Sequence, residues 1–164
     1  MLKLIGAAII ISGCGFFGFY KAQCLKKRAE EIGKIISGLV LLENEINYGK
    51  GDIKTVLASV GRMNGIEMFK YAAENTIEFG IKDSFKRAVE ECEAQFLGTE
   101  KEALILLAEN LGMTDTEAQI KSIRHTKALL ESAEETAKGE YARSGRLYRC
   151  AGVLTGFAVV ILLL

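Results

Sequence analysis

The chain has 164 residues and no proline, and its 21 lysine and arginine residues balance its 21 aspartate and glutamate residues. With no net charge, the chain has no overall positive potential that would attract nucleic acid. Its length suits one domain plus short additional segments. Hydrophobic residues make up 49% of a chain that is also 26% charged. Apolar residues therefore concentrate in blocks, and these blocks are the two ends.

The N-terminal block predicts a transmembrane helix over residues 1–21. Leu4 to Tyr20 is uncharged for 17 residues, at the short end of what a membrane-spanning helix needs. A basic cluster between Lys21 and Arg28 follows at once. Because basic residues stay on the cytoplasmic side, we expect the chain to continue into the cytoplasm.

Two alternatives compete with this interpretation. A cleaved secretory signal is disfavoured because apolar residues continue through Phe16 to Tyr20. The segment Ile11–Cys14 also resembles the lipobox of bacterial lipoproteins, in which the cysteine is lipidated. The alternative function is thus an exported lipoprotein with a helical binding domain, lipidated at Cys14.

The middle of the chain, residues 22–147, predicts a cytosolic bundle. Apolar residues at steps of three and four mark helices over about 29–48, 53–60, 67–79, 84–96, 99–111 and 115–164. Gly80 is expected to end the third helix, with Ile77 buried, and Cys92 is expected in the core of the fourth. No segment alternates as a strand does. We therefore expect an all-α, antiparallel bundle of about six helices with membrane helices at both ends.

Two capping boxes are predicted at helix starts. Thr99 with Glu102 opens the fifth helix, and Thr114 with Glu117 opens the last. In that last helix the buried stripe thins after Leu130. We expect the helix to form a stalk there or to pack against the start of the first helix.

The C-terminal block predicts a second transmembrane helix over residues 148–164. Cys150 to Leu164 is uncharged for 15 residues and spans about 22 Å, less than a hydrocarbon core of about 30 Å. Arg146 and Arg149 can reach the cytosolic interface, so this end predicts the same orientation as the first.

Small residues in both terminal blocks predict close helix packing. Cys14 and Gly18 recur four positions apart, and so do Gly152 and Gly156. This spacing lets helix backbones approach closely in lipid. We expect these four residues to form a helix–helix contact in the membrane.

No pattern of catalytic, cofactor-binding or metal-binding residues occurs. The sequence lacks a phosphate-binding loop, and His125 is its sole histidine, so two-histidine metal motifs are ruled out. The four cysteines show no CxxC spacing, which favours free thiols in a reducing compartment. We expect no cofactor and no enzymatic activity.

The unusual polar cluster is Glu43–Gly49, at the end of an apolar helix. Carboxylates there oppose the helix dipole, a small cost that cations can offset. One interpretation is salt bridges within the bundle, to a residue such as Arg62 or Lys121; the other is a protein-binding edge. The candidate partner-binding residues are Glu43, Glu45, Tyr48 and Gly49.

The same cluster carries a resemblance that covers essentially the whole chain. Residues 41–49 (LLENEINYG), 1–8 (MLKLIGAA) and 148–154 (YRCAGVL) resemble stage III sporulation protein AB of endospore-forming bacteria, and residues 112–115 (GMTD) and 119–121 (QIK) add to the match. That family is similar, in its cytosolic domain, to the inner-membrane platform protein of type II secretion and type IV pili.

The resemblance implies a platform in the channel complex that joins mother cell and forespore. The implied location is the mother-cell membrane around the forespore, with the bundle facing the cytoplasm. The implied partners are a stage III sporulation protein AA-like ATPase and other membrane components of the complex. The sequence leaves a homo-oligomer open and gives no support for nucleic acid.

Overall fold

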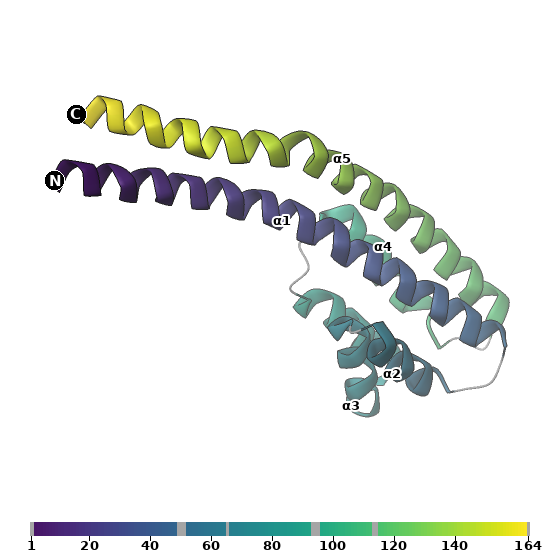
Figure 1. Ribbon diagram of the computed structural model, residues 1–164. Helices are drawn as coiled ribbons and strands as arrows, with labels where there is room; N and C mark the ends of the chain where they lie inside the picture. Colours follow the sequence, from purple (N-terminus) through teal and green to yellow (C-terminus); the bar gives the residue numbers. More distant parts are fainter. Residues whose placement is uncertain (1, 49–51, 65, 93–95, 113–114, 164) are drawn as a thin grey trace. The chain divides into compact units, whose positions relative to one another are not determined.

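The computed structural model describes residues 2–48, 52–64, 66–92, 96–112 and 115–163. Within these ranges the chain is all-α and forms five helices (Figure 1). The helices are α1 (Leu2–Asn47), α2 (Ile53–Asn64), α3 (Glu67–Glu91), α4 (Gly98–Asn110) and α5 (Thr116–Leu163). The predicted all-α class is confirmed.

Contacts divide the chain into two compact units. One, the terminal unit, comprises Met1–Ala29 and Glu135–Leu164, and the other, the bundle unit, comprises Glu30–Glu134. The predicted boundaries at residues 21 and 147 stay a prediction.

The core of the bundle unit follows the predicted helical spacing. Fully or almost fully buried residues on α1 are Ile32, Ile35, Leu39 and Leu42. They recur at steps of three and four, which places them on one face of the helix. Burying each such side chain stabilises the fold by about 1.5–3 kcal/mol before entropy is subtracted. The predicted α1 face is therefore confirmed.

Helix α3 replaces two predicted helices because it turns sharply at Gly80 and resumes at once. Gly80 has φ 78° and ψ 169°, a backbone conformation that glycine adopts without a Cβ clash. The rings of Phe69 and Phe85 lie 5.8 Å apart, although 16 helical residues would separate them by about 24 Å. The two halves of α3 therefore fold back on each other. The predicted end of a helix at Gly80 is confirmed, and the count is five instead of about six because α3 includes both predicted helices across this kink.

Two predicted core positions are corrected in α3. Ile77 is 81% exposed, because Gly80 turns the chain shortly after it and none of the described helices covers that face. Cys92 is only half-buried because α3 ends at Glu91, so Cys92 follows in extended backbone. The four cysteines, all within the described residues, are not joined in disulfides.

The start of α4 differs from its predicted capping box, while the box predicted for α5 includes a residue outside the described ranges. At α4, the backbone N–H of Leu97 donates to Glu100 Oε2 at 2.8 Å, two residues before the predicted pair. Glu100 is 4% exposed, so its carboxylate stays on the inward side of the first turn. At α5, Asp115 Oδ1 accepts from the Glu117 N–H at 3.0 Å, whereas Thr114 lies outside the described residues.

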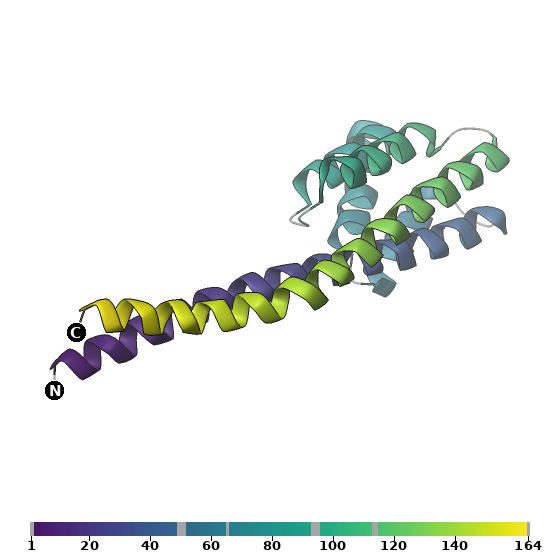
Figure 2. The same ribbon diagram turned by 90° about the horizontal axis from the view of Figure 1, so that it is seen from above.

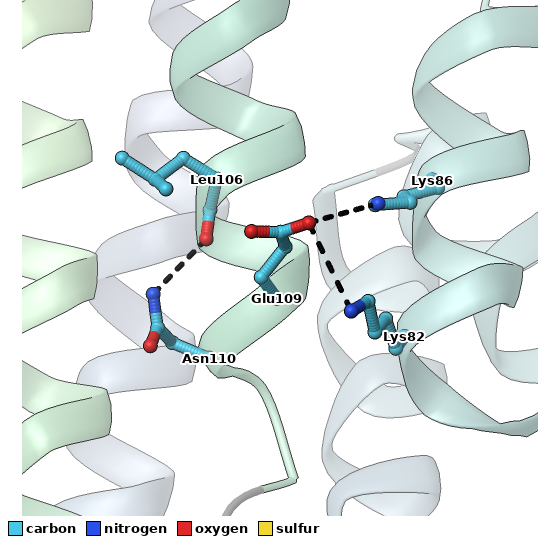
Figure 3. A network of polar contacts seen from close by, with 5 residues as sticks. All are labelled: Lys82, Lys86, Leu106, Glu109 and Asn110. Carbon is cyan, nitrogen blue, oxygen red and sulfur yellow. Dashed lines mark hydrogen bonds and ion pairs between the residues drawn. The ribbon is translucent and has the colours of Figure 1, made fainter.

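A polar network joins α3 to α4 (Figure 3). Lys86 Nζ lies 3.0 Å from Glu109 Oε1 and Lys82 Nζ lies 3.8 Å from the same oxygen. The hydrogen bond and the charge of Lys86, with the charge of Lys82, lower the pKa of Glu109 below its ordinary value. These ion pairs are partly exposed, so they add modestly to the packing of the two helices.

The terminal unit is a pair of helices running side by side, formed by the start of α1 and the end of α5 (Figures 1 and 2). Ala22 and Ala137 are 3% and 1% exposed, so small side chains fill this contact. Arg28 Nη1 lies 3.3 Å from Glu140 Oε2. The expected packing of the last helix against the start of the first is therefore present.

The two predicted membrane helices, 1–21 and 148–164, are not seen as spans. No helix in the described part of the chain holds a stretch long and apolar enough to cross a membrane.

Candidate functional site

Glu43, near the end of α1, is held by cations of α5. Arg124 Nε donates to Glu43 Oε1 at 2.6 Å, and Lys127 Nζ lies 3.9 Å from Glu43 Oε2. The Glu43 side chain is 16% exposed, so this ion pair is partly shielded from solvent. Salt bridges within the bundle were one interpretation of this cluster, but Arg124 and Lys127 form them instead of the suggested Arg62 or Lys121.

The other described members of the cluster face solvent. Glu45 is exposed and the Tyr48 side chain is 72% exposed, while the Tyr48 backbone N–H donates to the Asn44 carbonyl at 3.0 Å. Tyrosine is among the residues enriched at the energetic centres of protein interfaces. Gly49 lies outside the described residues. The structure thus separates Glu43, which has partners in the fold, from Glu45 and Tyr48.

A pocket of about 480 Å³ opens between α1 and the two halves of α3. Its buried lining is apolar and consists of Ile35, Ile66, Met68 and Ala88. Its polar lining consists of Glu31, Lys34, Glu67, Tyr71, Glu91 and Cys92. Sequence reasoning missed this pocket, because it depends on α3 folding back at Gly80.

Tyr71 and Glu91 are linked across the pocket. The hydrogen bond to Glu91, with burial and the charge of the same carboxylate, raises the pKa of Tyr71 above its ordinary value. The phenol therefore stays protonated near neutral pH, as an ordinary tyrosine does.

The terminal unit brings together the glycines on which its predicted packing depends. A Cβ added to Gly152 would lie 2.6 Å from the Cys14 carbonyl oxygen and 3.2 Å from Gly18 Cα. A Cβ on Gly18 would collide with the Tyr148 carbonyl oxygen. Gly156 is buried on the same helix. The two backbones are therefore in direct contact, while the membrane setting of that contact stays a prediction.

Cys14 and His125 show no catalytic arrangement. Cys14 lies inside α1 and His125 is exposed on α5. Across the described ranges, no three His, Cys, Asp or Glu side chains gather as metal ligands would. The lipidation of Cys14 and the absence of a cofactor both stay predictions.

Comparison with known proteins assigns the family. The sequence matches the stage III sporulation protein AB family over residues 3–164. This chain belongs to that family. It is also 28% identical over 172 aligned residues to stage III sporulation protein AB of Bacillus subtilis (strain 168), with both chains covered completely. The predicted resemblance is therefore confirmed, and the chain is a homologue of a sporulation protein.

No solved structure matches the chain. In this member of the stage III sporulation protein AB family, the geometry described above gives three candidate functional elements. They are the exposed helix end at Glu45 and Tyr48, the pocket beside α3, and the glycine contact of the terminal unit.

Proposed function

We propose that the chain is a membrane-attached platform of the channel complex between mother cell and forespore. The bundle unit faces the mother-cell cytoplasm, and it docks a stage III sporulation protein AA-like ATPase and other membrane components. Family membership supports the role in sporulation. The chain itself acts by binding and carries out no reaction.

The exposed apolar side chains of the terminal unit carry this proposal. Phe16 and Phe17 are 72% and 64% exposed on α1, and Leu154 and Ile161 are 67% and 76% exposed on α5. All four side chains belong to the terminal unit, and large exposed apolar patches mark membrane or protein contacts. The two helices attach to the bilayer as a pair whose glycine contact brings their apolar surfaces together.

A flotation experiment tests the attachment. The full chain is mixed with vesicles of phosphatidylglycerol and phosphatidylethanolamine and centrifuged through a density gradient. Phe16→Asp combined with Leu154→Asp should leave most of the protein at the bottom, because each charge would face the acyl chains. Ile77→Asp is the matched control, since Ile77 is even more exposed, at 81%, but lies in the bundle unit.

The proposal of membrane attachment is wrong if the unchanged chain stays at the bottom of the gradient. It is also wrong if Ile77→Asp reduces flotation as much as the double substitution does. Circular dichroism of each variant establishes that the helices are retained.

The orientation of the bundle unit rests on the basic residues beside the apolar ends. Lys21, Lys26 and Lys27 follow the first block, and Arg143 and Arg146 precede the second. Basic segments favour the cytoplasmic side, and anionic lipid adds about 1 kcal/mol for each nearby cation. Protease added outside intact cells should leave residues 30–134 uncut, and their degradation would overturn this orientation.

The ATPase is proposed to contact the helix end at Glu45 and Tyr48. Both side chains are exposed, whereas Glu43 already binds Arg124. Capture of the purified ATPase by the immobilised full chain should fall at least severalfold for Glu45→Ala combined with Tyr48→Ala. Leu129→Ala, a change at an apolar residue of α5 that is 47% exposed, serves as the control.

Undiminished capture by the double variant would remove this helix end from the interface. No capture by the unchanged chain would remove the ATPase from the proposed partners.

A further inference from the structure

The pocket between α1 and the two halves of α3 joins an apolar floor to an acidic opening. Ile35 and Met68 are each 2% exposed and form part of the floor. Glu67 and Glu91 are exposed at the opening. The whole lining contains three glutamates and one lysine. This excess of negative charge favours a cationic ligand group over an anionic one.

The shape of the pocket favours a ligand that is apolar along its length and charged at its end. Lysine and arginine side chains have this form, with a hydrocarbon stem and a cationic head. The volume of about 480 Å³ exceeds that of one such side chain and lies within the usual range for ligand pockets. Apolar neighbours of the inserted residue can therefore fill the remaining space over the floor.

We propose that this pocket receives an arginine or lysine side chain from a basic, apolar segment of a partner protein. The proposal rests on the platform role proposed above, because it assigns a contact point to a partner. It goes beyond that role by giving the partner's chemistry. A small free amine would satisfy the charge but would leave much of the apolar floor uncovered.

Cys92 reports on occupancy because its thiol lines the pocket. The full chain carrying Cys14→Ser, Cys24→Ser and Cys150→Ser retains Cys92 as its single thiol. The rate at which iodoacetamide alkylates Cys92 is measured by mass spectrometry, with and without a short helical peptide of leucine, alanine and arginine. The comparison peptide has citrulline, a neutral isostere, in place of each arginine.

The arginine peptide, at about ten times its dissociation constant, should slow alkylation about tenfold, and the citrulline peptide should have little effect. Glu67→Gln combined with Glu91→Gln should abolish this protection. Glu102→Gln combined with Glu117→Gln is the matched control, because these glutamates are exposed on other helices. Fluorescence anisotropy of the labelled peptides gives the same comparison without relying on thiol reactivity.

Equal protection by both peptides, or protection that survives Glu67→Gln with Glu91→Gln, would overturn the proposal. Spermidine protecting as well as the arginine peptide would assign the pocket to a small amine and would also overturn it. The ATPase capture experiment separates this failure from that of the platform role. If the unchanged chain captures the ATPase but does not bind the arginine peptide, only the pocket proposal fails.

Discussion

Arg124 Nε on α5 donates a 2.6 Å hydrogen bond to Glu43 Oε1 near the end of α1. The two residues are 81 positions apart, so this bond joins distant parts of the bundle unit. It also shows that the carboxylates of the Glu43–Gly49 cluster, which look alike in the sequence, have different surroundings. One carboxylate supports the fold, while Glu45 and Tyr48 remain exposed.

Glu43→Ala should lower the free energy of unfolding by about 1 kcal/mol. The pair is charge-assisted and Glu43 is partly shielded, but the Arg124 side chain is 65% exposed, which limits the contribution. Chemical unfolding of the purified chain in detergent, followed by circular dichroism, measures the change. Glu45→Ala is the control and should alter stability by less than about 0.5 kcal/mol. A larger loss from Glu45→Ala would contradict the assignment.

Gly38→Ala should destabilise the bundle unit although alanine favours helix. A Cβ at Gly38 would lie 2.5 Å from Phe69 Cε2 and 3.0 Å from Ile66 Cδ1, and Phe69 is fully buried. Overpacking of this kind costs about 1–3 kcal/mol, which outweighs a helix preference of about 0.5–1 kcal/mol.

Gly139→Ala is the matched comparison for Gly38→Ala. A Cβ at Gly139, inside α5, meets no atom within 4 Å, so this variant should be more stable than the unchanged chain by about 0.5–1 kcal/mol. Thermal unfolding of both variants checks the opposite signs. A higher melting temperature for Gly38→Ala would show that the Phe69 ring moves aside without cost.

Gly152→Val should separate the two helices of the terminal unit. Backbone atoms of Cys14 and Gly18 occupy the space that a larger side chain needs, and backbone cannot move as a flexible side chain does. Spin labels at Ser12→Cys and Thr155→Cys, on a background with the natural cysteines changed to serine, report the separation through dipolar broadening. Broadening should fall in the Gly152→Val variant.

Gly13→Val provides the control for the spin-label measurement. A Cβ at Gly13 meets nothing within 4 Å, so the dipolar broadening should be unchanged. If Gly152→Val leaves the broadening intact as well, the glycine contact does not set the helix separation.

The stability of the contact between α3 and α4 should depend on pH through Glu109. Lys86 and Lys82 lower its pKa in the folded state, so the folded protein binds the proton less readily than the unfolded chain. The stabilisation is fully present above the unfolded value of about 4.3 and is lost as pH falls through the lowered folded pKa. Melting temperatures of the unchanged chain and Glu109→Gln should therefore differ near neutral pH and converge in acid. If the difference in melting temperature is the same at every pH, Glu109 does not cause the pH dependence.

Helical spacing predicted which faces are buried, but it did not predict how distant helices align. Ile32, Leu39 and Leu42 are buried as their spacing requires. The partners of Glu43 differ from those suggested, because periodicity within α1 carries no information on which turn of α5 lies opposite. The exposure of Ile77 has the same origin, since its pattern indicates a face and not the element that covers it.

The candidate pocket illustrates a second limit. Its floor residues are ordinary core positions in the sequence, and its glutamates resemble any solvated helix surface. Only the fold-back of α3 brings Tyr71 and Glu91 together. A glycine in the sequence predicts an interruption, whereas the direction that the chain takes afterwards depends on its φ and ψ.

The break at Gly80 also means that the side-chain directions of the second half of α3 are not set by those of the first half. In an unbroken helix, inserting one residue would rotate every later side chain by about 100° and move buried residues toward water. At Gly80 the helical phase starts anew, so Phe69 and Phe85 need no fixed spacing to meet. A change of length next to this glycine should thus be absorbed locally, and the sequences on either side can vary in length without disturbing each other's buried face.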